Sequence, residues 1–134
     1  MNKILLDTNA FGKYIGGDHD VLTIIAESDI VYFSCTVIGE LIAGFHGGTQ
    51  YSKNREKLEQ FISKSSVSVL PIGFETAQIY GEIKNELKKN GTPIPINDIW
   101  IAASTVETGS VLITYDKHFL KIPGLRTWYH LKEL

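Results

Sequence analysis

Apolar residues follow two alternating patterns along this chain. Short apolar runs rich in β-branched residues predict strands at residues 3–6, 30–33, 67–71 and 111–114. Between these runs, apolar residues recur at spacings of three and four, which is typical of amphipathic helices. The predicted helices cover residues 8–15, 18 or 20 to 27, 37–45 with Thr36 as the cap, 53–65, 74–89, and 97 or 98 to 109. Short strands alternating with helices predict an α/β fold, with a mainly parallel sheet covered on both faces.

Four acidic residues lie beside these apolar segments. Asp7 ends the first strand run and Asp116 follows the last one, whereas Glu40 interrupts an apolar helix and Asp98 opens another. The carboxyl ends of parallel strands meet at one edge of a sheet, where ligands bind in such folds. We therefore expect Asp7, Glu40, Asp98 and Asp116 to come together at that edge.

A shared divalent cation would explain all four acids. Carboxylates beside core segments are costly unless they are paired, and no Lys or Arg adjoins the first three in sequence. Mg²⁺ and Mn²⁺ prefer such oxygen ligands. We expect Asp7 and Asp98 as direct ligands, with Glu40 and Asp116 binding directly or through water.

Each acid also has an ordinary structural role open to it. Residues 7–9 and 97–98 are good helix caps. Glu40 could lie on a narrow exposed stripe, and Asp116 could be a turn residue beside Lys117. Glu40 is the single acid that most favours a functional role, and the metal site is favoured by the four acids together.

Composition limits the class of protein. With 134 residues, 43% hydrophobic and 21% charged, the chain is expected to be one globular domain over residues 1–134. A net charge of −2 excludes a global basic surface, so nucleic acid would have to bind locally. The lone cysteine, Cys35, is expected in the core, and the chain is expected to be cytoplasmic, without a membrane span.

Other cofactor and metal motifs are absent. The histidines His19, His46, His118 and His130 lack zinc-ligand spacing, and His118 is expected to be a packing residue. The glycines match neither a P-loop nor a dinucleotide-binding pattern. Asn9 stands where a haloacid-dehalogenase-like phosphatase needs its second aspartate. We expect Trp100 and Trp128 in the core or at an interface.

The order and spacing of these segments resemble the PIN domain, and more narrowly the VapC-type toxins of toxin–antitoxin pairs. The resemblance covers nearly the whole chain. It begins with residues 4–9 and Glu40, and its most specific part is the run 91–103, which resembles the family's G-x-x-I…D-x-x-I-A-A pattern. Residues 112–119, Ile122, residues 124–125 and Trp128 complete it. Some relatives carry asparagine at the position of Asp116.

This resemblance implies a three-layer α/β/α fold and a Mg²⁺- or Mn²⁺-dependent endoribonuclease. It further implies an RNA substrate, a homodimer and inhibition by an antitoxin protein. Clustered carboxylates can hold the ions needed for phosphodiester hydrolysis, and no histidine base is required. Thr8 and Thr114 would support the ligands or position water, and Asn9 would orient Asp7.

Two other functional classes remain open from the residues. One is a Mg²⁺-binding regulatory domain of the receiver type, although Asp7 lacks the acidic neighbour of that class. The other is a nuclease of the same fold that acts on structured DNA or in RNA processing. For partners, we expect apolar interaction surfaces at residues 51–61 and 42–45, and an antitoxin Arg or Lys that reaches Asp7 or Asp98 and displaces the metal.

Overall fold

A four-stranded parallel sheet forms the centre of the computed structural model, which describes residues 2–128. The strands run in the order β3-β2-β1-β4. Their bounds are β1 (Lys3–Leu6), β2 (Ile30–Ser34), β3 (Val67–Leu70) and β4 (Val111–Ile113). β1 pairs with both β2 and β4, so its carboxyl end lies between theirs. The predicted parallel sheet is confirmed, with strand ends within one residue of the predictions.

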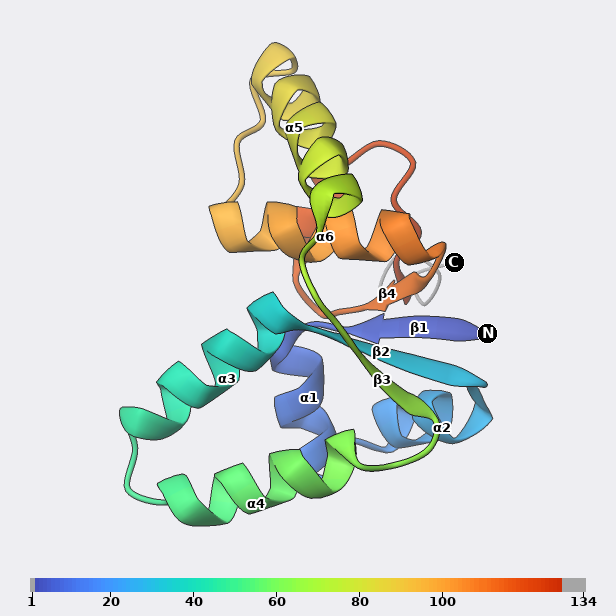
Figure 1. The fold of residues 1–134 in the computed structure, drawn as a ribbon. Helices are drawn as coiled ribbons and strands as arrows, with labels where there is room; N and C mark the ends of the chain where they lie inside the picture. The colour runs from blue at the N-terminus through green and yellow to red at the C-terminus, as the bar shows by residue number, and fades with distance from the viewer. Residues whose placement is uncertain (1, 129–134) are drawn as a thin grey trace.

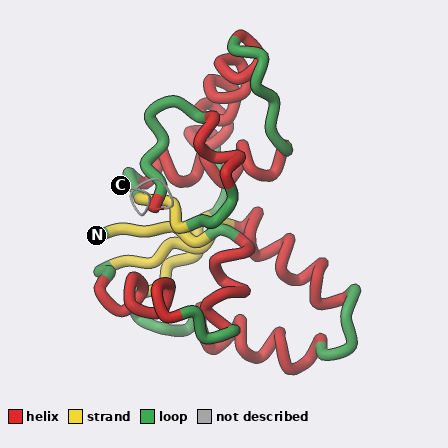
Figure 2. Tube along the Cα trace, turned by 180° about the vertical axis from the view of Figure 1, so that it is seen from behind, coloured by secondary structure: helices red, strands yellow, loops and turns green. Residues whose placement is uncertain are grey.

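Helices cover both faces of the sheet (Figures 1 and 2). Helices α5 and α6 lie on one face, and α1 to α4 lie on the other. Their bounds are α1 (Thr8–Ile15), α2 (His19–Glu27), α3 (Cys35–His46), α4 (Tyr51–Ile62), α5 (Phe74–Lys89) and α6 (Ile96–Thr108), followed by a 3-10 helix, η1 (Lys117–Lys121). This arrangement is the three-layer α/β/α fold that the resemblance implied. No helix within residues 2–128 is long and apolar enough to cross a membrane.

The core explains why the apolar strands are continuous. Residues 4–6 of β1 have no exposed surface, because helices cover both faces of this central strand. On the α1 side, the rings of Phe11, Phe33 and Phe61 meet at centroid distances of 5.2–5.5 Å, which joins α1, β2 and α4. On the other side, Tyr80 of α5 stacks on Trp100 of α6 at 4.0 Å.

Helix starts differ from the sequence prediction in three places, one of which is α4, which begins at Tyr51 and not at residue 53. The cap of α3 is Ser34, whose hydroxyl accepts a hydrogen bond from the Val37 amide at 3.2 Å, so the expectation for Thr36 was wrong. Helix α6 begins at Ile96 after Pro95, whose fixed φ suits a helix start. Asp98 therefore lies inside the first turn of α6 and does not cap it.

One expectation about exposed and buried residues was also wrong, and a second holds only in part. The wrong one concerns Cys35, which is exposed at the first position of α3. In the expected interaction surfaces, Leu58 and Phe61 are buried, and Ile42 and Phe45 pack partly against the core. Exposed apolar side chains lie elsewhere, with Phe74 at 87% exposure the most open among residues 2–128.

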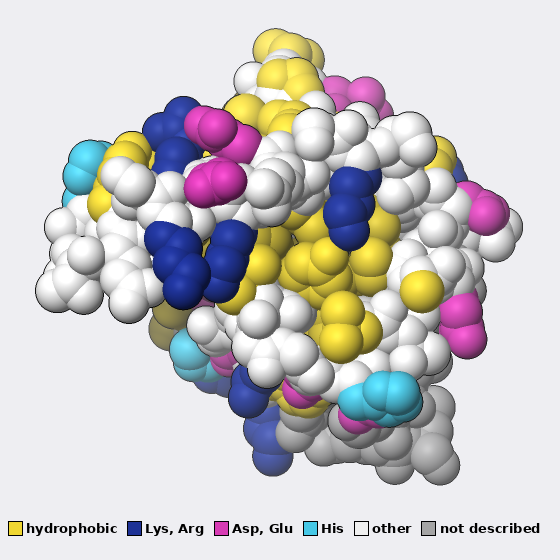
Figure 3. Space-filling view, turned by 90° about the horizontal axis from the view of Figure 1, so that it is seen from below, with side chains coloured by type: hydrophobic (Ala, Val, Ile, Leu, Met, Phe, Trp, Pro, Cys, Tyr) yellow, Lys and Arg dark blue, Asp and Glu magenta, His cyan; other side chains and the backbone are white. Residues whose placement is uncertain are grey.

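The face seen from below Figure 1 has apolar side chains gathered near its centre, with lysine and arginine side chains around them (Figure 3). A small cavity of about 150 Å³ lies between α1, α3 and α4. Its apolar wall is made by Phe11, Ile15, Leu41 and Phe45.

Candidate active site

The four predicted acids line one cavity of about 520 Å³ at the carboxyl edge of the sheet. Asp7 follows β1 directly, and Asp116 lies three residues beyond the end of β4. Glu40 is on α3, the helix that follows β2, and Asp98 is in the first turn of α6. The strand polarity that the sequence predicted brings Asp7 and Asp116 to this edge, and the starts of α3 and α6 add Glu40 and Asp98.

Asp7 is nearly buried, with 4% of its surface exposed. One carboxylate oxygen, Oδ1, accepts a hydrogen bond from the Ala10 amide at 2.7 Å and caps α1, while Oδ2 accepts one from the Thr114 hydroxyl at 2.5 Å. Burial raises the pKa of Asp7 to about 6, and these two hydrogen bonds oppose that shift. Each carboxylate oxygen keeps a further lone pair, so capping the helix does not prevent Asp7 from binding a cation.

A second group is formed by Asp98, Asp116 and His118. The His118 Nδ1 atom lies 3.3 Å from Asp98 Oδ2 and 3.2 Å from Asp116 Oδ1. Burial raises the pKa of Asp98 and the charge of Asp116 adds to this, whereas the hydrogen bond with His118 lowers it. The expectation that His118 is a packing residue was wrong, because its side chain is 46% exposed and contacts the acids.

Sequence reasoning missed His118 because its role depends on a local turn. The Asp116 side chain accepts a hydrogen bond from the His118 amide at 2.9 Å and so caps η1. This turn brings the imidazole back over the carboxylate. The available signal was the Asp-Lys-His spacing at residues 116–118, which a capped 3-10 turn folds onto itself.

Glu40 is held by two neighbours. Its Oε1 accepts a hydrogen bond from the Thr8 hydroxyl at 2.5 Å, and its Oε2 accepts one from the Asn97 side-chain amide at 3.2 Å. These bonds tie α3 to the starts of α1 and α6. Asn97 was considered from sequence as a possible helix cap, and the structure gives it this contact at the cavity instead.

The supporting residues lie in the same region. The Thr114 hydroxyl donates to Asp7 and also accepts from the Asp116 amide at 2.9 Å, so one side chain positions two acids. Thr8 binds Glu40, and Asn9 is exposed on the cavity wall. Ala10 and Thr114 orient Asp7, the role that the resemblance gave to Asn9.

The donor groups suit a hard divalent cation. One ligand atom from each of Asp98, Asp116 and His118 lies within 4.8 Å of the other two. Two ligands bound about 2.1 Å from one ion are separated by up to about 4.2 Å, so small side-chain movements suffice. Asp7 and Glu40 add further carboxylates to the cavity wall. Clustered acids without cysteine are typical of Mg²⁺ or Mn²⁺ sites, to which His118 adds one nitrogen.

Comparison with known proteins agrees with this fold. The PIN domain profile matches residues 4–125. Ribonuclease VapC2 of Rickettsia felis is 29% identical over 90% of this chain and 92% of its own length. The tRNA(fMet)-specific endonuclease VapC of Salmonella typhimurium is 30% identical over 94% of this chain and 96% of its own length. The solved structure of DNA-bound VapBC from Salmonella typhimurium superposes with a TM-score of 0.81 at 30% identity, covering 95% of this chain and 97% of that one. This chain is therefore a member of the PIN domain family and a relative of the VapC ribonucleases.

Proposed function

We propose that this protein is an endoribonuclease that hydrolyses RNA phosphodiester bonds with the help of Mg²⁺ or Mn²⁺. The supporting observation is the meeting of Asp7, Glu40, Asp98 and Asp116, from four separate segments, around one cavity. An isolated group of buried or half-buried acids is costly in a stable fold, which favours a functional reason for it. The ribonuclease relatives support RNA as the substrate.

Asp98, Asp116 and His118 would hold the cation, with Asp7 and Glu40 beside them. When bound, the cation supplies the positive charge that phosphodiester hydrolysis requires. Thr114 keeps the Asp7 carboxylate and the Asp116 backbone in fixed positions. The carboxylates that remain unprotonated can accept the proton of an attacking water, and Asn97 and Thr8 hold Glu40 for this role.

Purified protein should cleave RNA in Mg²⁺ or Mn²⁺ and should lose this activity in EDTA. Asp98→Asn should reduce cleavage at least about a thousandfold, because it removes a charge from the centre of the cluster. Exposed Asp29→Asn serves as the matched control and should keep full activity. Single-stranded DNA and a DNA hairpin, tested in parallel, separate the RNA-specific enzyme from a structure-specific DNA nuclease. Metal binding without any cleavage would instead favour a regulatory domain.

We further propose that the protein is the toxin of a toxin–antitoxin pair and forms a homodimer. The similar Salmonella VapBC structure supports a protein partner. An arginine or lysine side chain of that partner would enter the cavity, pair with the carboxylates of Asp7 and Asp98, and displace the cation. Co-expression with the neighbouring small protein should give a stable complex with no cleavage activity. If the two proteins fail to co-purify, the partner proposal is wrong while the nuclease proposal stands.

A further inference from the structure

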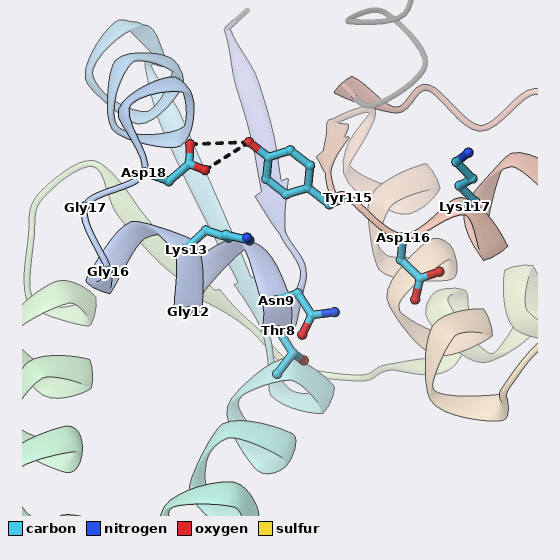
Figure 4. A pocket seen from close by; sticks show the side chains of 10 residues that line it. All are labelled: Thr8, Asn9, Gly12, Lys13, Gly16, Gly17, Asp18, Tyr115, Asp116 and Lys117. Atoms are coloured by element: carbon cyan, nitrogen blue, oxygen red, sulfur yellow. Dashed lines mark hydrogen bonds between the residues drawn. The ribbon is translucent and has the colours of Figure 1, made fainter.

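A second, larger cavity of about 910 Å³ adjoins the acid cavity. The two cavities share Thr8, Asn9 and Asp116, so they form one continuous depression. Figure 4 shows the second cavity between the end of α1 on one side and the segment from Tyr115 to Lys117 on the other. The acids of the candidate active site therefore lie at one end of a longer groove.

The second cavity differs from the acid cavity in charge. Lys13, in the last turn of α1, and Lys117, at the start of η1, line opposite walls and are both exposed (Figure 4). The Lys13 amine lies 5.5 Å from the centre of the Tyr115 ring, which keeps it over the groove. A cation on each wall suits a polyanion that runs between them.

Two acids, Asp18 and Asp116, also line this cavity, and Asp18 is engaged in structural contacts. Its carboxylate accepts hydrogen bonds from the Val21 amide at 3.1 Å and from the Tyr115 hydroxyl at 3.2 and 3.3 Å. Asp18 thereby caps α2 and fixes the Tyr115 ring. Lys13, whose charge also acts on Asp18, is the exposed cation on the α1 wall that suits an anionic ligand.

We infer that this groove binds the RNA strand next to the bond that is cut, with Lys13 contacting a flanking phosphate. The inference rests on the proposed RNA cleavage. An endonuclease substrate continues on both sides of the scissile phosphate, so a strand held at the acids must leave through adjoining surface. With a net charge of −2, the protein does not attract RNA over its whole surface, and such a local contact becomes important. Lysine binds phosphate as a flexible point charge without reading sequence.

The test is RNA binding by wild-type protein, Lys13→Gln and Lys13→Arg in Mg²⁺. The probe is a fluorescein-labelled, 12-nucleotide, single-stranded RNA of mixed sequence with 2′-O-methyl riboses, which prevents cleavage. Fluorescence anisotropy at several salt concentrations gives the affinity and its salt dependence. Lys84→Gln is the matched control, because Lys84 is an exposed lysine on α5, across the sheet from α1.

Lys13→Gln should weaken binding about five- to tenfold at low salt and should reduce the slope of log affinity against log salt by about 0.7, the value for one phosphate on a single strand. Lys13→Arg should restore both quantities, and Lys84→Gln should change neither. With cleavable RNA, Lys13→Gln should raise KM and leave kcat nearly unchanged.

Three results would overturn the inference, and they are distinguishable. If wild-type protein neither cleaves RNA nor binds the probe, the proposed function fails together with the groove. If wild-type protein does both, but Lys13→Gln behaves like Lys84→Gln, the groove assignment alone is wrong. If Lys13→Gln binds RNA normally but no longer binds the co-expressed small protein, the groove belongs to the protein partner.

Discussion

At the scale of single residues, Asp7 combines a structural and a chemical role. Its carboxylate accepts a hydrogen bond from the Ala10 amide, which caps α1, and another from the Thr114 hydroxyl. The side chain is nevertheless almost entirely buried. Burial disfavours the charged form, and the nearby Asp116 and Asp98 disfavour it further. The ionised site is therefore destabilising for the metal-free protein.

The expected consequence is that Asp7→Asn stabilises the metal-free protein in a pH-dependent way. The pKa of Asp7 is raised from 3.8 in the unfolded chain to about 6 in the folded protein. Ionised Asp7 therefore does not destabilise the fold below pH 3.8. The destabilisation grows between the two pKa values and is complete above about pH 6. A shift of this size corresponds to about 3 kcal/mol, from which the altered contact with Thr114 subtracts about 1 kcal/mol. Urea unfolding in EDTA should show a gain of about 1–3 kcal/mol at pH 8 and none at pH 4.

Asp29→Asn is the control for this experiment, because Asp29 is exposed. It should leave the free energy of unfolding within about 0.5 kcal/mol of wild type at both pH values. A stability loss for Asp7→Asn at pH 8 would mean that the hydrogen bonds of the ionised carboxylate outweigh its burial.

His118 gives a second residue-scale prediction, about metal preference. An imidazole beside two carboxylates favours ions such as Co²⁺ and Ni²⁺, whereas Mg²⁺ prefers oxygen ligands. His118→Ala should lower Co²⁺ affinity about tenfold or more and change Mg²⁺ affinity much less, as measured by calorimetric titration. His19→Ala, at the exposed start of α2, should change neither affinity. Equal losses for both ions would show that His118 only orients Asp98 and Asp116.

At the scale of elements, the helix starts determine where the acids point. Helix α3 follows β2 without a loop, because Ser34 is both the last residue of β2 and the cap of α3. This junction fixes the direction of α3 and thereby places Glu40 within reach of Thr8 and Asn97. The 3-10 helix η1 has the same role after β4, since it turns His118 back toward Asp116.

Removing the α3 cap should therefore be measurable. Ser34→Ala should lower the free energy of unfolding by about 1–2 kcal/mol, because the Val37 amide loses its acceptor and the site is fully buried. Thr36→Ala, two residues further along, should cost less than about 0.5 kcal/mol. Chemical denaturation of both variants checks this pair, and the opposite ranking would contradict the assignment of Ser34 as the cap.

At the scale of the whole molecule, the sheet order explains both the site and the surfaces that stay exposed. β1 is central, so the acid that follows it is buried between the helices of both layers, whereas β3 is an edge strand. The chain leaves this edge toward α5 through Ile72 and Phe74, which are 44% and 87% exposed. Exposed apolar side chains such as these, in the connection from β3 to α5, are candidates for contact with a second subunit.

If the proposed homodimer uses this surface, Phe74→Ser should raise the dissociation constant of the dimer at least about tenfold, because aromatic side chains dominate such contacts. Sedimentation equilibrium would measure the effect, and the thermal stability of the monomer should be nearly unchanged since Phe74 is so exposed. Leu22→Ser, at 40% exposure on α2, is the control. A dimer unaffected by Phe74→Ser would place the interface elsewhere, and a monomeric wild-type protein would contradict the dimer itself.

The sequence alone determined the layers of this protein and the edge where its acids meet. The apolar runs and the helical spacings show directly which residues are buried. The strands then run parallel because helices connect them. Because each acid lies a few residues from a strand end or a helix start, local position was enough to place Asp7, Glu40, Asp98 and Asp116 at one cavity.

Tertiary structure alone decided the contacts that depend on distance between segments and on side-chain direction. The bond between Thr114 and Asp7 joins residues 107 positions apart, and the one between Asn97 and Glu40 joins residues 57 apart. One or two residues at the end of an element decide local details of this kind, because competing local structures there differ little in free energy. Examples are the exposure of Cys35, the cap at Ser34 and the orientation of His118. Periodicity fixes which face of an element is buried, but the packing of neighbouring elements fixes what its terminal residues contact.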